Sequence, residues 1–474
     1  MPAHVKARIT MYRMQELGDC FLLTFTAGRD VSRMLIDCGC FRNSGSSIAR
    51  IKTVVADIKT TLDGAPLDVV AGTHQHNDHV NGFFHAEKEF RDIGVKQTFL
   101  SWLDNPEDRR AQEVGDKFHN LRKQIVQIRD GLHKKLRGAR NAATRGTEAF
   151  QLLDGLLGFF GAQKNADGPP EVPAKGIGVL KKIGTVKPEY LKPGRSLDMP
   201  GLPAGTVRIH VLGPPRETEL LYRKDPREGE SYDRELAAAS LHADRFLSAV
   251  AGKSDGSSRQ EDNYPFNAEF KRTRPASGSA LARVMKRYRH TGESWRTIDE
   301  DWMDQAGALA LYLDTYTNNS SLALAIELVA SRKVLLFAAD AQTGNWLSWK
   351  NVKWDDPKVT TDSLIERTVF YKAGHHASHN ATLPEVFDKM NHPDLVALIP
   401  VDKSDPNIKK DDGWKMPAEH LFEHLKKQTS NRVLQMDDRN PPECNPDKAA
   451  KGAWKKVGIK PKVTDLSITL DIKG

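Results

Sequence analysis

The sequence predicts a mixed α/β fold whose strands end on residues that can bind metal. Short apolar runs alternate with amphipathic stretches of helical period, which is the pattern of strands joined by helices. Several apolar runs also end on aspartate or histidine, side chains that ligate divalent cations in proteins. With 474 residues, the chain is long enough for one large domain with insertions or for two to three smaller domains.

The N-terminal region is expected to form an antiparallel meander followed by a helix. Turn-forming residues, among them Gly18 and Gly28, separate its apolar runs. The predicted strands are residues 5–14, 20–26 and 33–37, and the predicted helix is residues 51–61. Asp37 ends the third strand, where an acid is unusual as a core residue. It could initiate a turn at this point.

A cluster of metal-binding residue types follows the next apolar run. Residues 67–72 predict a buried strand and residues 80–92 predict a helix, so the cluster between them lies on a strand-to-helix loop. It consists of His74, His76, Asp78 and His79. Such a loop directs the first two side chains one way and the last two another, as ligands of two neighbouring cations. The alternative is a polar loop whose histidines are only hydrogen-bonded.

Two segments interrupt this pattern and are expected to be insertions. The first, residues 107–204, follows a strand predicted at residues 95–102 and begins with long amphipathic helices rich in Lys and Arg. Its candidate nucleic-acid contacts are Arg122, Lys123, Arg129, Lys134 and Lys135. A solvated helix face is the alternative interpretation of these charges. The second, residues 216–304, follows a strand at residues 207–212 and contains a Gly/Ser/Asp-rich flexible loop at residues 253–262.

The remaining metal-binding candidates end two later apolar runs. Residues 333–340 run apolar into Asp340, and a buried carboxylate at a strand end needs a cation or a strong donor. Asp340 is therefore the candidate that bridges two metals. Residues 368–373 are a second such strand, followed by Gly-His-His-Ala-Ser-His. We expect His375 to supply the last ligand, with His376 as the alternative.

The order of these motifs resembles the metallo-β-lactamase superfamily. The resemblance is carried by His-x-His-x-Asp-His at residues 74–79, the strand that ends on Asp340, and the strand that ends on histidines 375–376. The chain is more closely similar to the hydrolase domain of competence DNA-uptake channel proteins. Their Gly-Asp strand start resembles residues 18–20, and their Lys-x-Gly-His-His-Gly-Ser pattern resembles residues 372–378, with alanine in place of the last glycine.

This resemblance implies a four-layer αββα metallo-β-lactamase sandwich, formed as one domain by residues 1–474 around the two largely helical insertions. It also implies two divalent metal ions, Zn or Mn, and an aspartate at the place of Asp37 that orients the histidine loop through hydrogen bonds. Many members supply a further histidine before the strand of the bridging aspartate, where this chain has Asn318 and Asn319. Either asparagine could support the first metal, which is otherwise weakly bound or absent.

The implied activity is metal-dependent hydrolysis, in which two bridged cations turn a shared water into hydroxide. Asp78 would ligate a metal and orient the attacking oxygen. Candidates to assist the leaving group, or only to support the ligands, are His376, Ser378 and His379. The net charge of +8 favours a polyanion, so a nuclease or other phosphodiesterase acting on DNA or RNA is expected. Trp346 and Trp349 could stack bases or belong to the core.

Two alternative functions stay open at this level. A small-molecule hydrolase would cleave lactone or thioester carbonyls in an apolar pocket, with substrate binding that does not depend on salt. A non-catalytic component of a multi-protein system, such as one in bacterial defence, would use the insertions as surfaces for protein partners. The sequence does not determine the oligomeric state.

Composition predicts a cytoplasmic protein with no membrane contact. No apolar run approaches the roughly 18 residues of a membrane-spanning helix, and the N-terminus lacks an apolar signal core. The 4 cysteines show neither CxxC spacing nor a disulfide framework, so they are expected to be reduced. Cys38 and Cys40, close to the predicted metal site in sequence, could alternatively act as ligands.

Overall fold

The computed structural model has the mixed α/β fold that the sequence predicts, with two mixed sheets. The described residues are 4–138, 151, 153–161, 172–223, 278–288, 311, 313–409, 414–440 and 448–474. Most of the second predicted insertion, including the loop at residues 253–262, lies outside them.

The first sheet contains the predicted N-terminal meander. In spatial order its strands are β14 (Lys462–Val463), β15 (Ser467–Lys473), β1 (Val5–Tyr12), β2 (Cys20–Ala27), β3 (Asp30–Cys38), β4 (Leu67–Ala71), β5 (Val95–Ser101) and β6 (Glu189–Leu191). Neighbours are antiparallel from β14 to β3 and parallel from β3 to β6. The carboxyl ends of β3, β4 and β5 therefore lie at one edge of the sheet.

The second sheet has the same mixed character. Its strands are, in spatial order, β13 (Val433–Gln435), β12 (Val396–Ile399), β11 (Thr368–Lys372), β10 (Lys333–Phe337), β9 (Ala323–Leu328), β8 (Val207–Gly213) and β7 (Ser196–Asp198). Pairing is parallel from β13 to β10 and antiparallel from β10 to β7. The carboxyl ends of β10 and β11, where metal-binding residues were predicted, lie side by side.

A continuous apolar core joins the two sheets. The ring of Phe21 on β2 meets the ring of Phe337 on β10 edge to face, with centroids 5.6 Å apart, and Phe337 contacts Phe370 on β11 at 5.2 Å. Because β2 and β10 belong to different sheets, the sheets pack face to face. Each fully buried large apolar side chain stabilises this arrangement by about 1.5–3 kcal/mol.

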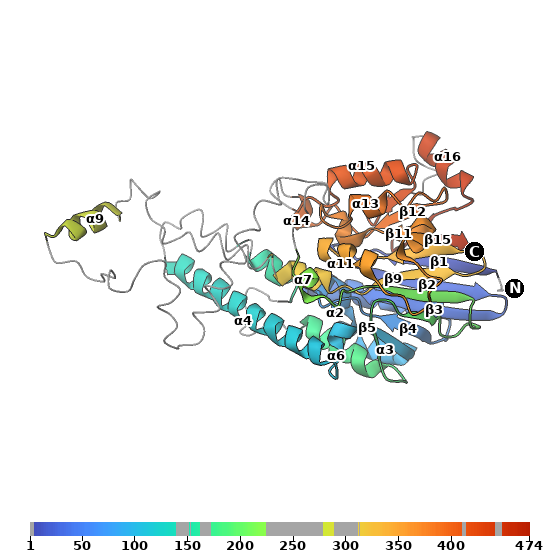
Figure 1. Ribbon diagram of the computed structural model, residues 1–474, viewed down its shortest axis with the longest axis horizontal. Coiled ribbons are helices and arrows are strands. Elements are labelled where there is room, and N and C mark those ends of the chain that lie inside the picture. Colours follow the sequence, from blue (N-terminus) through green and yellow to red (C-terminus); the bar gives the residue numbers. More distant parts are fainter. Residues whose placement is uncertain are drawn as a thin grey trace.

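Helices lie on both sides of the strands (Figure 1). Near β4 and β5 are α2 (Asn77–His85), α3 (Glu87–Ile93) and α6 (Val172–Ile183), and near β11 and β12 are α13 (Pro384–Phe387) and α15 (Glu419–Gln428). The single helix expected at residues 80–92 is two helices, α2 and α3, because the backbone leaves helical geometry at Ala86 (φ −121°, ψ 31°). The other predicted N-terminal helix is part of α1 (Gly45–Leu62), which Ser44 caps by accepting the N–H of Ser47 at 3.1 Å.

The first predicted insertion contains long helices, but its last part belongs to the body of the fold. Helix α4 (Arg109–Gly138) is long and extends away from the sheets (Figure 1). After it, residues 153–158 are also helical. However, α6 packs against α2, and β6 and β7 join the edges of the two sheets, so residues 172–204 belong to the body of the fold.

The other described elements are short. They are η1 (Trp102–Asp104), α7 (Thr218–Leu221), α9 (Ala280–Tyr288), α11 (Thr343–Ser348), η6 (Trp349–Asn351), α12 (Thr361–Glu366), η7 (Gly374–Ala377), α14 (Pro406–Lys409) and α16 (Lys448–Lys456). Within the part of the chain that the structure describes, no helix combines the length and apolarity needed to cross a membrane.

Candidate metal centre

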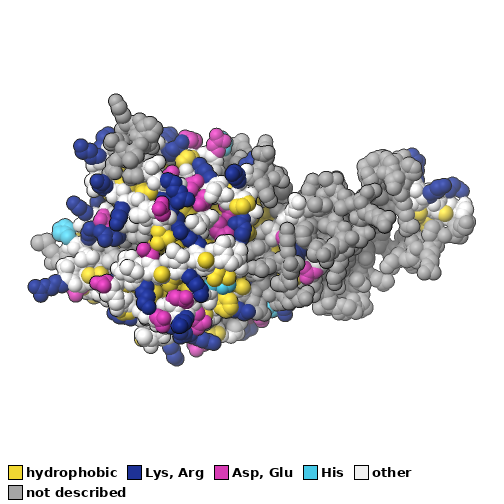
Figure 2. All heavy atoms as spheres, turned by 180° about the vertical axis from the view of Figure 1, so that it is seen from behind, with side chains coloured by type: hydrophobic (Ala, Val, Ile, Leu, Met, Phe, Trp, Pro, Cys, Tyr) yellow, Lys and Arg dark blue, Asp and Glu magenta, His cyan; other side chains and the backbone are white. Residues whose placement is uncertain are grey.

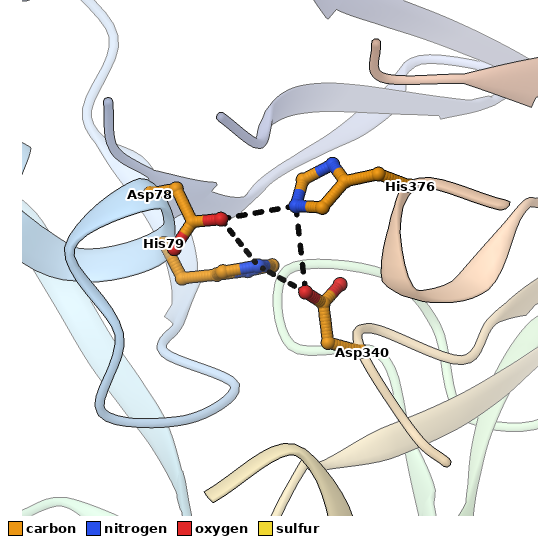
Figure 3. A group of neighbouring side chains, drawn as sticks. All are labelled: Asp78, His79, Asp340 and His376. Atoms are coloured by element: carbon orange, nitrogen blue, oxygen red, sulfur yellow. Dashed lines mark hydrogen bonds and ion pairs between the residues drawn. The ribbon is translucent and has the colours of Figure 1, made fainter. Parts of the chain in front are cut away.

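Four buried side chains converge where the strand ends of the two sheets meet (Figure 3). Asp78 and His79 come from the first turn of α2, Asp340 follows β10, and His376 follows β11 in η7. Oδ2 of Asp78 lies 3.0 Å from Nε2 of His376 and 3.9 Å from Nε2 of His79. Oδ2 of Asp340 lies 3.2 Å from Nε2 of His79 and 3.4 Å from Nε2 of His376.

This quartet has the geometry and chemistry of a cation site. Four ligand atoms bound tetrahedrally at 2.0–2.1 Å are about 3.3 Å from one another, close to the spacing observed here. The four side chains are 0–1% exposed. Oδ1 of Asp78 is buried without a hydrogen-bond partner among the described residues. Two imidazole nitrogens and two carboxylate oxygens suit Zn or Mn, so the residues present fit a divalent metal.

Asp37 holds the histidine loop through the hydrogen bonds that the resemblance implied. Its Oδ1 accepts the backbone N–H of Thr73 at 2.8 Å, and its Oδ2 accepts the Thr73 hydroxyl at 2.7 Å and lies 2.8 Å from Nδ1 of His79. This contact directs Nε2 of His79 toward Asp340. The backbone of Asp37 is left-handed (φ 57°). Next to it, a Cβ on Gly39 would come within 2.3 Å of the carbonyl oxygen of Asn77, so the loop approaches β3 only because residue 39 is glycine.

His74 and His76 form a second, less complete group of donors beside the quartet. Nε2 of His74 lies 3.2 Å from Nδ1 of His76, and both side chains are buried. On the other side of the His76 ring, Nε2 lies 3.8 Å from Oδ1 of Asp314. Among the described residues, no third His, Cys, Asp or Glu completes a compact set of three with this pair. A first metal at this pair would therefore have fewer protein ligands than the quartet offers.

His375 does not join the quartet, although the sequence favoured it over His376. Its Nδ1 lies 2.7 Å from the hydroxyl of Ser378 and 3.2 Å from Nε2 of Gln342, and its Nε2 lies 3.3 Å from Nδ2 of Asn318. Both histidines have a left-handed backbone, with φ of 41° and 52°. Neighbouring residues in such a turn project their side chains in different directions, and only His376 faces Asp340. The structure brings the alternative candidate, His376, to Asp78 and Asp340.

The two asparagines differ in what they contact. Asn318 donates from Nδ2 to Oδ2 of Asp314 at 3.0 Å, and its buried Oδ1 has no hydrogen-bond partner among the described residues. Asn319 instead accepts the backbone N–H of Asn345 at 2.9 Å and donates to the carbonyls of Leu221 and Arg223. Asn319 therefore fixes loops, and its predicted support of a metal is wrong. All of its hydrogen-bonding groups point to the backbone.

Ser378 and His379 lie on the His375 side of the site. The Ser378 hydroxyl contacts His375, as described above, and donates to Oδ1 of Asn380 at 2.7 Å. His379 is half-buried and close enough to His375 for its charge to lower the pKa of that ring. Neither side chain belongs to the compact donor group around Asp340.

Lys372 and Asp19 are site residues that the candidate ligand set did not include. Nζ of Lys372 lies 2.5 Å from Oδ2 of Asp19 and 3.2 Å from Oδ1 of Asp340, and it donates to the carbonyl of Ala339 at 3.0 Å. Lys372 is 1% exposed. The backbone N–H of Asp19 donates to the carbonyl of Asp78 at 2.8 Å, which ties this pair to the histidine loop. A lysine that ends the buried strand β11 gives the same signal that identified Asp340.

The pKa values of the quartet residues are shifted by the charges around them. Burial alone would raise the pKa of Asp340, but His79, His376 and Lys372 outweigh burial and hold that pKa well below its usual range. Burial would likewise lower the pKa of His79, but carboxylates, Asp340 foremost, hold it well above its ordinary value. The pKa of His376 is raised in the same way. Without a metal, the surrounding carboxylates therefore favour the protonated form of both imidazoles.

The outer histidines have the opposite property. Burial, the largest cause, lowers the pKa of His76 to about 3 and that of His375 to about 4, and it holds the pKa of His74 well below its ordinary value. These rings are neutral near pH 7, the form in which imidazole binds a metal.

The predicted nucleic-acid contacts on α4 are only partly available. Arg122 and Arg129 are 6% and 3% exposed, and Arg129 pairs with Asp130 at 2.7 Å and lies 3.8 Å from Asp154. Their prediction as surface contacts is wrong, because both side chains are buried and the charge of Arg129 is paired within the protein. Lys123 is exposed. The side chains of Lys134 and Lys135 lie outside the described residues.

Burial settles the role of the two tryptophans. Trp346 and Trp349 are each 1% exposed, and their rings contact one another with centroids 4.0 Å apart and planes tilted by 35°. They therefore belong to the core and cannot stack bases. Cys38 and Cys40 are buried free thiols, and neither belongs to a compact donor group among the described residues.

No protein-family model and no curated protein matches the chain. What the protein does must be inferred from its own residues.

Proposed function

We propose that the protein is a metal-dependent hydrolase, and that it cleaves phosphodiester bonds in DNA or RNA. The observation that carries this proposal is the buried quartet of Asp78, His79, Asp340 and His376, whose spacing suits one divalent cation. The order of these ligands along the chain supports the resemblance to metallo-β-lactamase hydrolases. The face-to-face sheets with helices on both sides support the four-layer sandwich of that superfamily as the proposed fold.

The charge of the site supports a cationic cofactor. Asp19, Asp37, Asp78 and Asp340 are all buried within a few ångströms of His79 or His376, and Lys372 is the buried lysine among them. Burying carboxylates without compensating cations is costly. A divalent ion held by the quartet, or a pair of Zn or Mn ions if His74 and His76 hold a second, would supply Lewis acidity and activate water.

The protein side chains have separate roles in this proposal. Asp37 fixes the tautomer and orientation of His79, and Lys372 holds Asp340 in place. The unpartnered Oδ1 of Asp78 can accept a hydrogen bond from the attacking water. His379, half-buried at the edge of the site, is the candidate that gives a proton to the leaving oxygen.

A phosphodiester substrate is favoured by the net charge of +8, which attracts polyanions. A second candidate is hydrolysis of a small apolar lactone or thioester. It is favoured by the apolar surroundings of His76, whose ring centroid lies 5.2 Å from that of Phe159 and 4.8 Å from that of Phe160. Both phenylalanines are buried, so they would give the site an apolar environment rather than an open pocket wall.

The test incubates the purified protein with circular DNA, linear DNA and RNA in Mn or Zn, beside an Asp340→Ala control. Metal-dependent cleavage that the control lacks is the expected result. Hydrolysis of bis(p-nitrophenyl) phosphate, a minimal phosphodiester, is measured in parallel. If both phosphodiester substrates stay intact while a thioester is cleaved, the second candidate replaces the first.

A further inference from the structure

A cleft of about 810 Å³ opens at the start of α4, outside the metal centre. Its charged lining residues are Arg109, Arg110, Lys117, Arg216, Asp108 and Glu113. Residues 109, 113 and 117 are four apart, as are 110 and 114, so α4 presents two adjacent rows of side chains to the cleft. Lys and Arg thus outnumber Asp and Glu along its wall by four to two.

The two acids leave part of this positive charge unpaired. Asp108 binds Arg216 through Oδ2 at 2.8 Å, and Glu113 binds Arg109 at 3.0 Å. No carboxylate of the described residues pairs with Arg110 or Lys117, which are both exposed. These two cations are available to a negatively charged ligand.

Arg216 is held in a fixed position in the cleft. Its guanidinium carbon lies 3.9 Å from the centroid of the Trp102 ring, while Asp108 holds one edge of the group. Trp102 is itself fixed, because its indole N–H donates to the carbonyl of Pro214 at 3.1 Å. A planar guanidinium that is fixed before binding loses less entropy when it contacts a phosphate.

The cleft is connected to the metal centre through two of its walls. On one side, η1 carries both Trp102 and Asp104, and Oδ1 of Asp104 accepts the side-chain N–H of Gln75 at 2.8 Å. Gln75 is the residue between His74 and His76 in the histidine loop. On the other side, the cleft residue Tyr222 stacks on Tyr316 at 5.0 Å. Tyr316 lies two residues after Asp314, the carboxylate near His76.

We propose that this cleft binds the sugar–phosphate backbone of a nucleic-acid strand and leads it to the metal centre, an inference that rests on the proposed phosphodiesterase activity. Arg110 and Lys117 contact successive phosphates, and Arg216 anchors the strand nearest the centre. From Arg109 to Lys117 the helix rises about 12 Å, longer than a single phosphate needs. On the face in Figure 2, by comparison, Lys and Arg are interspersed with Asp and Glu.

The test measures binding of a short fluorescein-labelled single-stranded oligonucleotide by fluorescence anisotropy. All proteins carry Asp340→Ala, so that cleavage does not interfere. The cleft variant is Arg110→Glu with Lys117→Glu, and the control variant is Arg29→Glu with Lys59→Glu. The control residues are also exposed, and the control changes the net charge by the same amount.

The expected result is an affinity at least about tenfold lower for the cleft variant, with the control near the parent. The slope of log affinity against log salt should also fall by about 1.4, for two lost contacts to a single strand. Equal losses in the two variants, no loss in the cleft variant, or no binding by the parent would overturn the inference. Hydrolysis of bis(p-nitrophenyl) phosphate by the unaltered protein reports separately on the proposed function. Hydrolysis without the cleft effect rejects the cleft alone, and the cleft effect without hydrolysis rejects the activity alone.

Discussion

Replacing Lys372 with methionine should destabilise the metal-free protein strongly. At an effective dielectric constant of about 20, its contacts at 2.5 Å to Asp19 and 3.2 Å to Asp340 correspond to attractions of about 7 and about 5 kcal/mol. Most of this offsets the cost of burying the three charges. Removing only the lysine leaves two carboxylates buried without it, and such losses amount to about 3–5 kcal/mol.

The free energy of unfolding should be measured by urea titration with chelator present and again with Zn. Lys389→Met is the matched control, because Lys389 also pairs with an aspartate, Asp362, but at an exposed position. Its loss should stay below about 1 kcal/mol. With Zn bound, the loss from Lys372→Met should shrink, since the metal replaces positive charge beside Asp340. Equal losses in the two variants would refute the electrostatic reasoning, and an effect that Zn leaves unchanged would separate Lys372 from the metal centre.

Three other predictions concern the site. His376→Asn should weaken Zn binding, measured by calorimetry, by more than about 100-fold, whereas His375→Asn should weaken it by less than about tenfold; equal effects would contradict the ligand assignment. The pKa values of His79 and His376 are raised on folding, so the stability they contribute is full below their ordinary pKa of 6.5 and is lost as the pH rises through the folded values. Chelated protein should therefore melt at a lower temperature as the pH is raised above 6.5, and a melting temperature that rises instead would show that these rings are neutral. Gly39→Ala should reduce both stability and Zn affinity, because its Cβ collides with the carbonyl of Asn77, and unchanged circular dichroism melting and calorimetry would show that the loop can move away.

The parts of the site that the sequence predicted are those defined by strand ends. Asp340 could be identified because an acid after a buried apolar run needs a partner. The histidine loop could be identified because several metal-binding side chains lie within a few consecutive residues. Parallel pairing then brings such residues to one edge of each sheet. The choice between His375 and His376 could not be made in this way, since it depends on the left-handed turn that follows β11.

The features that the sequence did not predict depend on tertiary packing. Arg122 and Arg129 lie in an amphipathic helix, and the pattern of its charges does not reveal that another segment covers this side and supplies Asp154. The contact between Lys372 and Asp19 joins residues that are far apart in the chain, so no local pattern could pair them. In both cases the charged residue is visible in the sequence, but its partner depends on how distant segments pack.

The division of the quartet between the two sheets sets the order in which the site can form during synthesis. His79 leaves the ribosome about 260 residues before Asp340, a delay of roughly 13–50 s at 5–20 residues per second. In that interval the histidine loop has neither Asp340 nor His376, and the apolar face of the first sheet lacks strands β10 and β11 of the second sheet. A metal captured early would have the loop residues as its ligands. The quartet is therefore complete only after His376 has been made, and a metal taken up before then gains Asp340 and His376 as ligands only when strands β10 and β11 pack against the first sheet.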